Sequence, residues 1–320
     1  MKIHIIGTVN GLTNEGMRNV ATHLARGFET HHTVVYSGLR DIAALWANSR
    51  RSDVTLVFAR ANRQVYWLMR VVERLCKNTW LVCVQKPMDN FLALNRKRPL
   101  RCGYLYLAQE DMQAVKLAAG YEKHAFAPGI DTQKFVPVDT ARQMALKEKY
   151  GFAPDRPVVV HVGHCSAGRG LEAFFSLDRE KYQRMVVASG MFEDEATVAA
   201  LEADGVKIHC GYLEHIEQIY QLADIYLFPT VSTEYVISIP LSVMEALACG
   251  TPVMGFKAFG NWQQIAAAKD AVTLVSTAEE LGGAADALAL RKGEERLLHS
   301  PQTWQAAADG ILDVIRSTMR

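Results

Sequence analysis

Short apolar runs alternate with amphipathic stretches along the whole chain. In the first part, runs rich in Val, Ile and Leu are followed by polar loops and then by apolar residues at helical spacing, which predicts strands followed by helices. The expected strands are 2–7, 33–37, 54–59, 79–84 and 103–108, with helices from 17 onward, at 64–76 and at 111–119. Strands separated by helices form parallel crossover units, so this part is expected to be doubly wound.

A second series of the same kind follows a polar connection at 137–155, which contains an expected helix at 140–150. Its strands are expected at 158–163, 185–190, 206–210, 225–229 and 251–256. Apolar residues recur at helical spacing in 303–319, which predicts one amphipathic helix. The expected domains are therefore 1–137 and 138–302, followed by a terminal helix at 303–320, and both domains are of the α/β class with Rossmann-like, doubly wound sheets.

Composition narrows the class of protein. The chain has 320 residues, of which 49% are hydrophobic and 22% charged, as in a globular protein. No apolar run approaches the roughly 20 residues that span a bilayer, and Met1 leads directly into a strand without the pattern of a secretory signal, so a cytoplasmic location is expected. A net charge of +1 gives no reason to expect nucleic acid as a partner. The six cysteines lack the short spacing of a zinc site, so no metal is expected.

The most informative segment is 223–252, ADIYLFPTVSTEYVISIPLSVMEALACGTP, which predicts a strand, a loop, a helix and a turn. Ser238 is expected as the N-cap of a helix that starts at Ile239, with Ser242 and Glu245 near the same face. The free amides of a helix start favour a diphosphate, and a carboxylate one turn later can accept two hydrogen bonds from a ribose diol. The alternative for Glu245 is an ordinary solvated helix carboxylate.

The stretch VMEALACGTPV at 243–253 resembles the L-E-A-M-A-C-G-x-P-V element of glycosyltransferase family four, whose members are retaining enzymes of the GT-B fold. The resemblance implies that Glu245 holds the ribose of a nucleotide-sugar donor and that Ile239 lies beside the donor. The other glutamate of the family's pair, eight positions earlier, falls on Ile237. Glu234 is the candidate that reaches the sugar in its place.

A second match is HVGHCSAGRGLE at 161–172, which resembles the family's V-G-R-L-x-x-x-K-G element. Gly163 lets the backbone approach a phosphate, and His164 and Arg169 fall on the family's two basic positions. Arg169 keeps its charge and is expected to stabilise the leaving diphosphate, whereas histidine is charged only below a pKa of about 6.5. The alternative for His164 is a structural loop histidine.

Two further stretches match the family's order. APGIDTQKFVP at 127–137 resembles the element that ends the first domain, where Asp131 is expected to cap a turn and Phe135 to anchor the linker. FGNWQQI at 259–265 resembles a G-G-x-x-E element near the phosphates and sugar. Gln264 stands there in place of the usual glutamate.

The acceptor is expected to bind on the loops of the first domain. Small and hydroxyl-binding residues follow the first strand, and no histidine follows the fourth or fifth strand, where the family often has one. That role is therefore vacant or passes to Gln85, Lys86 or Asp89 in the loop after the fourth strand. The acceptor-side candidates are Asn10, Gly11, Asn14, Glu15, Gly16, Gln85 and Asp89.

The resemblance implies an activity and an architecture. The two domains are expected to face each other across a cleft, with the terminal helix crossing back to the first domain. The expected reaction moves a sugar from a nucleotide-diphosphate sugar to a hydroxyl of a glycan, glycolipid or small molecule, with retention and without a metal or other cofactor. The main alternative is a degenerate relative that binds a nucleotide sugar without efficient catalysis, because Ile237, His164 and Gln264 depart from the pattern. A nucleotide-sugar epimerase shares the fold but has no positive support.

The stretch FLALNRKRPLR at 91–101 combines four basic residues with apolar neighbours Phe91, Leu92 and Leu94. A solvated basic loop is the default interpretation. The alternative is a patch for an anionic membrane surface or a lipid-diphosphate acceptor, since each basic residue near such a surface contributes about 1 kcal/mol. Peripheral contact with the inner face of a membrane and a lipid-linked acceptor therefore remain open.

Overall fold

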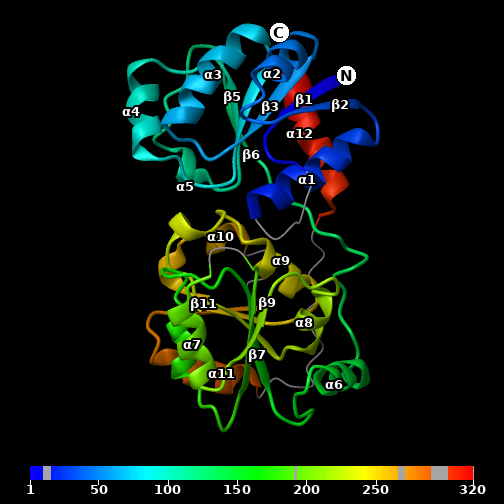
Figure 1. Cartoon of the computed structure of the whole chain (residues 1–320), viewed down its shortest axis with the longest axis vertical. Helices are drawn as coiled ribbons and strands as arrows, with labels where there is room; N and C mark the ends of the chain where they lie inside the picture. The colour runs from blue at the N-terminus through cyan, green and yellow to red at the C-terminus, as the bar shows by residue number, and fades with distance from the viewer. Residues whose placement is uncertain (10–15, 191–192, 266–270, 290–301, 320) are drawn as a thin grey trace. The chain divides into compact units, whose positions relative to one another are not determined.

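The computed structural model describes residues 1–9, 16–190, 193–265, 271–289 and 302–319 (Figure 1). The chain divides into two compact units. Unit 1 consists of Met1–Gly129, Val236–Ile239 and Gln302–Arg320, and unit 2 of Ile130–Tyr235 and Pro240–Pro301. The first boundary thus lies at Gly129 rather than at 137, and four residues of the 223–252 segment belong to unit 1.

Unit 1 is built on a parallel six-stranded sheet in the order β2-β1-β3-β4-β5-β6. Its strands are β1 (Lys2–Ile6), β2 (Thr33–Ser37), β3 (Val54–Phe58), β4 (Thr79–Cys83), β5 (Gly103–Tyr106) and β6 (Lys123–Ala125). The apolar runs predicted all of them except β6, whose sequence Lys-His-Ala has no apolar run. β3 and β4 are buried along their whole length, which is why they read as continuous apolar segments.

The helices of unit 1 cover this sheet. They are α1 (Gly16–Glu29), α2 (Ile42–Arg50), α3 (Arg63–Leu75), α4 (Asp89–Lys97), α5 (Gln109–Met112) and α12 (Trp304–Thr318). α12 packs on α1 so closely that a Cβ atom added to Gly27 would lie 2.7 Å from the Cβ of Ala308. The terminal helix therefore belongs to unit 1, as the resemblance implied.

The expected helix at 111–119 is wrong, because α5 ends at Met112. The Asn95 side chain donates a hydrogen bond to the carbonyl of Lys116 at 2.8 Å, which takes up a backbone acceptor that a continued helix would use. Val115 is buried in the core of unit 1. Tertiary contacts thus override the local helical pattern in this stretch.

Unit 2 is built on a second parallel six-stranded sheet, in the order β12-β11-β10-β7-β8-β9. Its strands are β7 (Val158–Gly163), β8 (Gln183–Ala188), β9 (Lys207–Cys210), β10 (Ile225–Phe228), β11 (Val253–Phe256) and β12 (Val272–Val275). The sequence predicted all but β12. The helices are α6 (Thr140–Lys149), η1 (Leu171–Ser176), α7 (Glu195–Ala203), α8 (Glu217–Leu222), η2 (Thr233–Tyr235), α9 (Leu241–Ala248), η3 (Lys257–Phe259), α10 (Trp262–Ile265) and α11 (Glu280–Ala289).

Each sheet has one point at which the chain order reverses. In unit 1 it lies between β1 and β3, and in unit 2 between β7 and β10. Ligands of open α/β sheets bind outside the carboxyl ends of the strands at such a point. The loops after β7 and β10 are therefore the first place to look for a site in unit 2.

No helix in the described part of the chain is long and apolar enough to cross a bilayer.

The six cysteines form no disulfides: all six are free, and five of them are buried.

Candidate donor site in unit 2

The loop after β7 is fixed to the end of β10. The hydroxyl of Thr230, just after β10, donates to the carbonyl of Arg169 at 3.2 Å. Gly170 has a φ of 75°, and a Cβ atom there would run into the carbonyl oxygen of Pro229. Only glycine fits this close approach in a left-handed conformation. The two loops at the reversal point of the sheet therefore form one rigid edge.

Arg169 is buried at this edge, with an exposed fraction of 4%. A Cβ atom added to Gly163 would lie 2.6 Å from Nη2 of Arg169 and 2.8 Å from Nε2 of His161. Gly163 therefore makes room for these two side chains. Burial lowers the pKa of Arg169, but a guanidinium stays protonated in proteins, so the edge carries a fixed positive charge.

His161 is a residue that the sequence analysis missed. Its Nδ1 lies 3.0 Å from the carbonyl oxygen of Leu227, so Nδ1 carries the proton and donates. Burial and the charge of Arg169 lower its pKa to about 3, which keeps the ring neutral. Nε2 has no hydrogen-bond partner among the described residues and lies beside the space left by Gly163. The signal in the sequence was a histidine inside an otherwise apolar strand.

His164 lies just after β7 and is partly buried. Its Nδ1 is 2.5 Å from Oγ of Ser189, which follows β8. This hydrogen bond fixes the orientation of the ring at the carboxyl edge of the sheet. The contact is compatible with a structural loop histidine and with a phosphate-binding role.

Glu245 lies in the second turn of α9 and is held by a tyrosine. The hydroxyl of Tyr220, from α8, donates to Oε2 of Glu245 at 2.7 Å. Burial raises the pKa of the Glu245 carboxyl to about 7, although the hydrogen bond from Tyr220 and the nearby charge of Lys134 oppose the shift. Ser242, one turn earlier, is hydrogen-bonded to the Tyr226 hydroxyl at 2.7 Å. Both tyrosines support polar side chains of α9, and neither was singled out from the sequence.

The expected start of this helix is wrong. α9 begins at Leu241, and Pro240 occupies the N-cap position without a side-chain hydrogen bond. A residue before proline avoids helical backbone angles, so Ile239 cannot be helical and Ser238 cannot cap the helix. The Ser238 hydroxyl instead donates to the carboxylate of Asp111, and its amide donates to the carbonyl of Val84 at 2.8 Å.

Ser238 and the buried Ile239 therefore lie in unit 1, next to the end of β4. Ile237, at the position of the family's other glutamate, packs against Gly16, where an added Cβ atom would lie 3.0 Å from its Cγ2. Gln85 lies two residues after β4, and Asp89 begins α4 with an exposed side chain. The structure thus brings Ser238 and Ile237 together with the acceptor-side loops of unit 1.

The remaining predicted site residues are either exposed or outside the described part of the chain. Glu234 is exposed in η2. Some predicted positions fall outside the described residues: Asn10, Gly11, Asn14 and Glu15, together with the side chain of Gln264. Within the described part of the chain, no three or more His, Cys, Asp or Glu side chains are grouped so that they could hold a metal ion.

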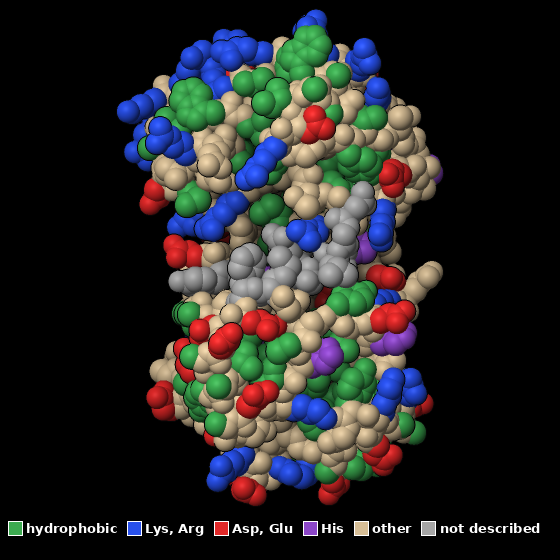
Figure 2. All heavy atoms as spheres, in the orientation of Figure 1, with side chains coloured by type: hydrophobic (Ala, Val, Ile, Leu, Met, Phe, Trp, Pro, Cys, Tyr) green, Lys and Arg blue, Asp and Glu red, His purple; other side chains and the backbone are tan. Residues whose placement is uncertain are grey.

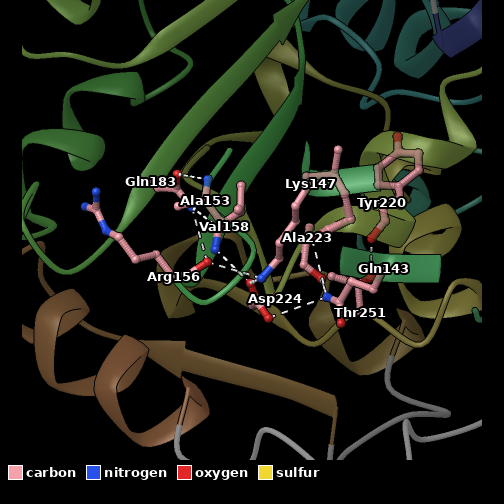
Figure 3. Close-up of polar contacts among 11 residues, drawn as sticks. Gln143, Lys147, Ala153, Arg156, Val158, Gln183, Tyr220, Ala223, Asp224 and Thr251 are labelled. Atoms are coloured by element: carbon pink, nitrogen blue, oxygen red, sulfur yellow. Dashed lines mark hydrogen bonds and ion pairs between the residues drawn. The ribbon is translucent and has the colours of Figure 1, made fainter. Parts of the chain in front are cut away.

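A buried polar network lies at the opposite, amino ends of β7 and β10 (Figure 3). Nζ of Lys147, on α6, lies 2.6 Å from Oδ2 of Asp224, and that carboxylate also accepts the amide of Val158 at 2.8 Å. Gln143 donates to the carbonyl of Ala223 at 3.2 Å, which ties α6 to the end of α8. The network therefore fixes α8, the helix that presents Tyr220 to Glu245.

The raised pKa of Glu245 predicts a pH-dependent stability. The pKa of this carboxyl rises from 4.5 to about 7 on folding, so the native state binds its proton more tightly than the unfolded state does. The resulting stabilisation is complete below pH 4.5 and is lost as the pH rises through 7. The Glu245→Gln variant keeps an acceptor for Tyr220 but has no charge to bury. We expect its unfolding free energy to exceed that of the wild type by of order 1–3 kcal/mol at pH 8 and by much less at pH 5.

Urea unfolding at both pH values measures this difference. The matched control is Glu148→Gln, at an exposed position on α6, for which no pH-dependent difference is expected. If the unfolding free energies of Glu245→Gln and the wild type differ by the same amount at pH 5 and pH 8, burial of the charged carboxylate does not destabilise the native state.

Comparison with known proteins finds similarity over the same stretch of the chain. Residues 156–292, which contain Gly163, Arg169 and Glu245, match the family model described as glycosyl transferases group 1. A sulfoquinovosyl transferase of Arabidopsis thaliana is 25% identical over 187 residues, which cover 57% of this chain and 35% of the relative. A D-inositol 3-phosphate glycosyltransferase of Segniliparus rotundus is 26% identical over 216 residues, covering 60% of this chain and 46% of the relative. The chain thus spans less than half the length of these relatives.

The solved structures establish the fold. The Anabaena protein HepE, solved in complex with UDP-glucose, matches with a TM-score of 0.72 at 13% identity, covering 99% of this chain and 97% of that protein. Two parallel six-stranded sheets with flanking helices, together with this match, give the chain the GT-B fold. The residues that match the family model lie in unit 2, apart from Val236–Ile239.

Proposed function

We propose that the protein is a glycosyltransferase that uses a nucleotide-diphosphate sugar. The observation that carries the proposal is that the segment matching glycosyl transferases group 1 contains both a buried cation, Arg169, and a carboxylate held by a tyrosine, Glu245. The cation can bind a diphosphate, and the carboxylate can accept hydrogen bonds from a ribose diol. The fold neighbour bound to UDP-glucose supports this class of donor.

The chemistry follows from the charges. As the bond between sugar and diphosphate breaks, negative charge develops on the leaving phosphate, and a preorganised cation in a dry site stabilises that charge strongly. Arg169 is shielded from water, and the glycine at position 163 leaves room for its guanidinium. The amino end of α9 adds the partial positive charge of a helix start.

The proposed stereochemistry and metal requirement come from the family resemblance. An acceptor hydroxyl attacks on the face from which the nucleotide leaves, with the departing phosphate as base, so the anomeric configuration is retained. Protein cations carry the phosphate charge, and no metal is required. The proposed acceptor is a glycan, a lipid-linked sugar or a small molecule, bound by the loops of unit 1.

A transfer assay with a panel of nucleotide sugars tests the proposal. We expect turnover with at least one donor, unchanged by EDTA, and a product whose anomeric configuration, determined by NMR, matches that of the donor. Activity that EDTA abolishes and manganese restores would contradict metal independence, and an inverted product would contradict retention.

The binding-only alternative has one specific observation in its favour. Ile237, which stands where the family has a sugar-contacting glutamate, is buried against Gly16. A protein that only binds the donor would be stabilised by about 2.7 kcal/mol at 100 times the dissociation constant, without turnover. Thermal stabilisation by a nucleotide sugar without turnover of any donor in the panel would therefore favour this alternative.

A further inference from the structure

The charge of the chain is segregated. Residues 40–101 contain 13 Lys and Arg against 4 Asp and Glu, a formal net charge of +9, whereas the whole chain has a net charge of +1. The rest of the chain therefore carries −8. The stretch 40–101 includes α2, α3 and α4, which carry six of the 13 basic residues, and the other seven lie in the loops around these helices.

α3 has an outward stripe that is unusual for a surface helix. Its inward residues Val65 and Met69 lie in the core of unit 1. On the outer side, Trp67 is 55% exposed and Val71 is 49% exposed, four residues apart. Exposed arginines continue this stripe at both ends of the helix, namely Arg63 and Arg74.

α2, which packs against α3, repeats the pattern. Ile42 is 79% exposed and Trp46 is 51% exposed, again one turn apart. The guanidinium of Arg50, one turn further, lies 4.8 Å from the centre of the Trp46 ring. Figure 2 shows hydrophobic side chains standing among Lys and Arg side chains over the part of unit 1 that contains α2, α3 and α4.

The stretch 91–101 contributes charge but no apolar insertion. Phe91 and Leu92 are buried in the core and Leu94 is partly buried against it, so the apolar neighbours of these basic residues do not stand at the surface. Arg96 and Lys97, by contrast, are exposed. The carbonyl of Arg98 accepts the hydroxyl of Tyr66 at 2.9 Å, which fixes this stretch beside α3.

We propose that this basic-aromatic face, formed by the outer sides of α2, α3 and α4, adsorbs to an anionic lipid bilayer. Tryptophan side chains settle at the boundary between headgroups and acyl chains, while arginines pair with anionic headgroups. The exposed aliphatic side chains gain from insertion at that boundary. The binding does not require the sugar-transfer reaction, so it is measurable without any donor.

Other occupants fit the face less well. Nucleic acid would pair with the arginines but offers nothing to Ile42 and Val71, which are aliphatic and exposed. A second copy of the same face is disfavoured because both would carry the same positive charge. A bilayer surface satisfies the cations, the indole rings and the aliphatic side chains together.

Co-sedimentation of the full chain with vesicles tests the proposal. We expect binding to vesicles of 30% phosphatidylglycerol in phosphatidylcholine, weak binding to pure phosphatidylcholine, and a shift of tryptophan emission to shorter wavelength on binding. The double variant Arg63→Gln with Arg74→Gln is expected to bind about thirtyfold more weakly. The double variant Trp46→Ser with Trp67→Ser is expected to lose at least about tenfold in affinity.

The matched controls lie in unit 2 and replace the same kinds of exposed side chain. They are Phe175→Ser with Tyr212→Ser for the apolar pair and Arg142→Gln with Arg179→Gln for the charges, and none should change vesicle binding. Equal binding to neutral and anionic vesicles would overturn the proposal. So would an unchanged affinity of both face variants, or tighter binding to single-stranded RNA than to anionic vesicles.

Discussion

Replacing Arg169 by alanine is expected to lower kcat for sugar transfer about 10²–10³-fold while the protein stays folded. The guanidinium is the fixed positive charge at the edge formed by the loops after β7 and β10. It is buried there, and the backbone carbonyl of Arg169 accepts a hydrogen bond from the Thr230 hydroxyl. Its charge acts most strongly when the diphosphate leaves. The loss should therefore appear in kcat more than in the affinity for the donor, measured by single-turnover kinetics and by calorimetry.

Two controls separate chemistry from folding. Arg169→Lys keeps a charge but cannot reproduce the planar fork, so it should recover only part of the rate. Arg184→Ala removes another buried arginine of unit 2, which pairs with Asp204 at 2.6 Å, and should reduce stability without a specific effect on kcat. An Arg169→Ala variant that keeps the wild-type melting temperature and the wild-type kcat would remove Arg169 from the reaction.

Replacing Lys147 by methionine is expected to cost about 3–5 kcal/mol of unfolding free energy. The ammonium is 1% exposed and lies 2.6 Å from Asp224, whose carboxylate would remain in the interior without its cation. That carboxylate also accepts the amide of Val158, so the start of β7 should be disturbed. Urea unfolding monitored by circular dichroism measures the loss.

The matched control is Lys149→Met on the same helix, whose ammonium makes an exposed hydrogen bond to Gln218 at 2.9 Å. It should change stability by less than about 0.5 kcal/mol. The double variant Lys147→Met with Asp224→Asn removes both charges and should recover part of the lost stability. A double variant as unstable as Lys147→Met alone would show that the cost arises from packing rather than from an unpaired buried charge.

The parts of the fold that local pattern determines could be predicted from the sequence. Buried parallel strands read as apolar runs, so β7 was predicted at its observed bounds. The Asp131 carboxylate accepts the amides of Gln133 and Lys134 at 3.1 Å each, which confirms the expected cap. Phe135 is buried against the ring of Tyr220, so the expected anchor of the linker is confirmed as well.

The parts that depend on distant contacts could not be predicted. Nothing near Gly129 in the sequence indicates that its lack of a side chain admits the backbone of Trp304. Ser238 looked like a helix cap because its partner, Asp111, lies 127 positions away. Tyr220 and His161 read as ordinary core residues, since their roles exist only once the loops and α9 have been brought to them.

The same distant contacts set an order of events during synthesis. Gln305 of α12 donates to the carbonyl of Gly27 in α1 across 278 positions, so α1 stays uncovered until the last helix has left the ribosome. At about 5–20 residues per second, this wait is roughly 15–55 s. Unit 2 takes all of its chain from earlier positions than α12 and can close first. α1 is thus made long before the helix that covers it, and its exposed apolar face is a target for chaperones in the meantime.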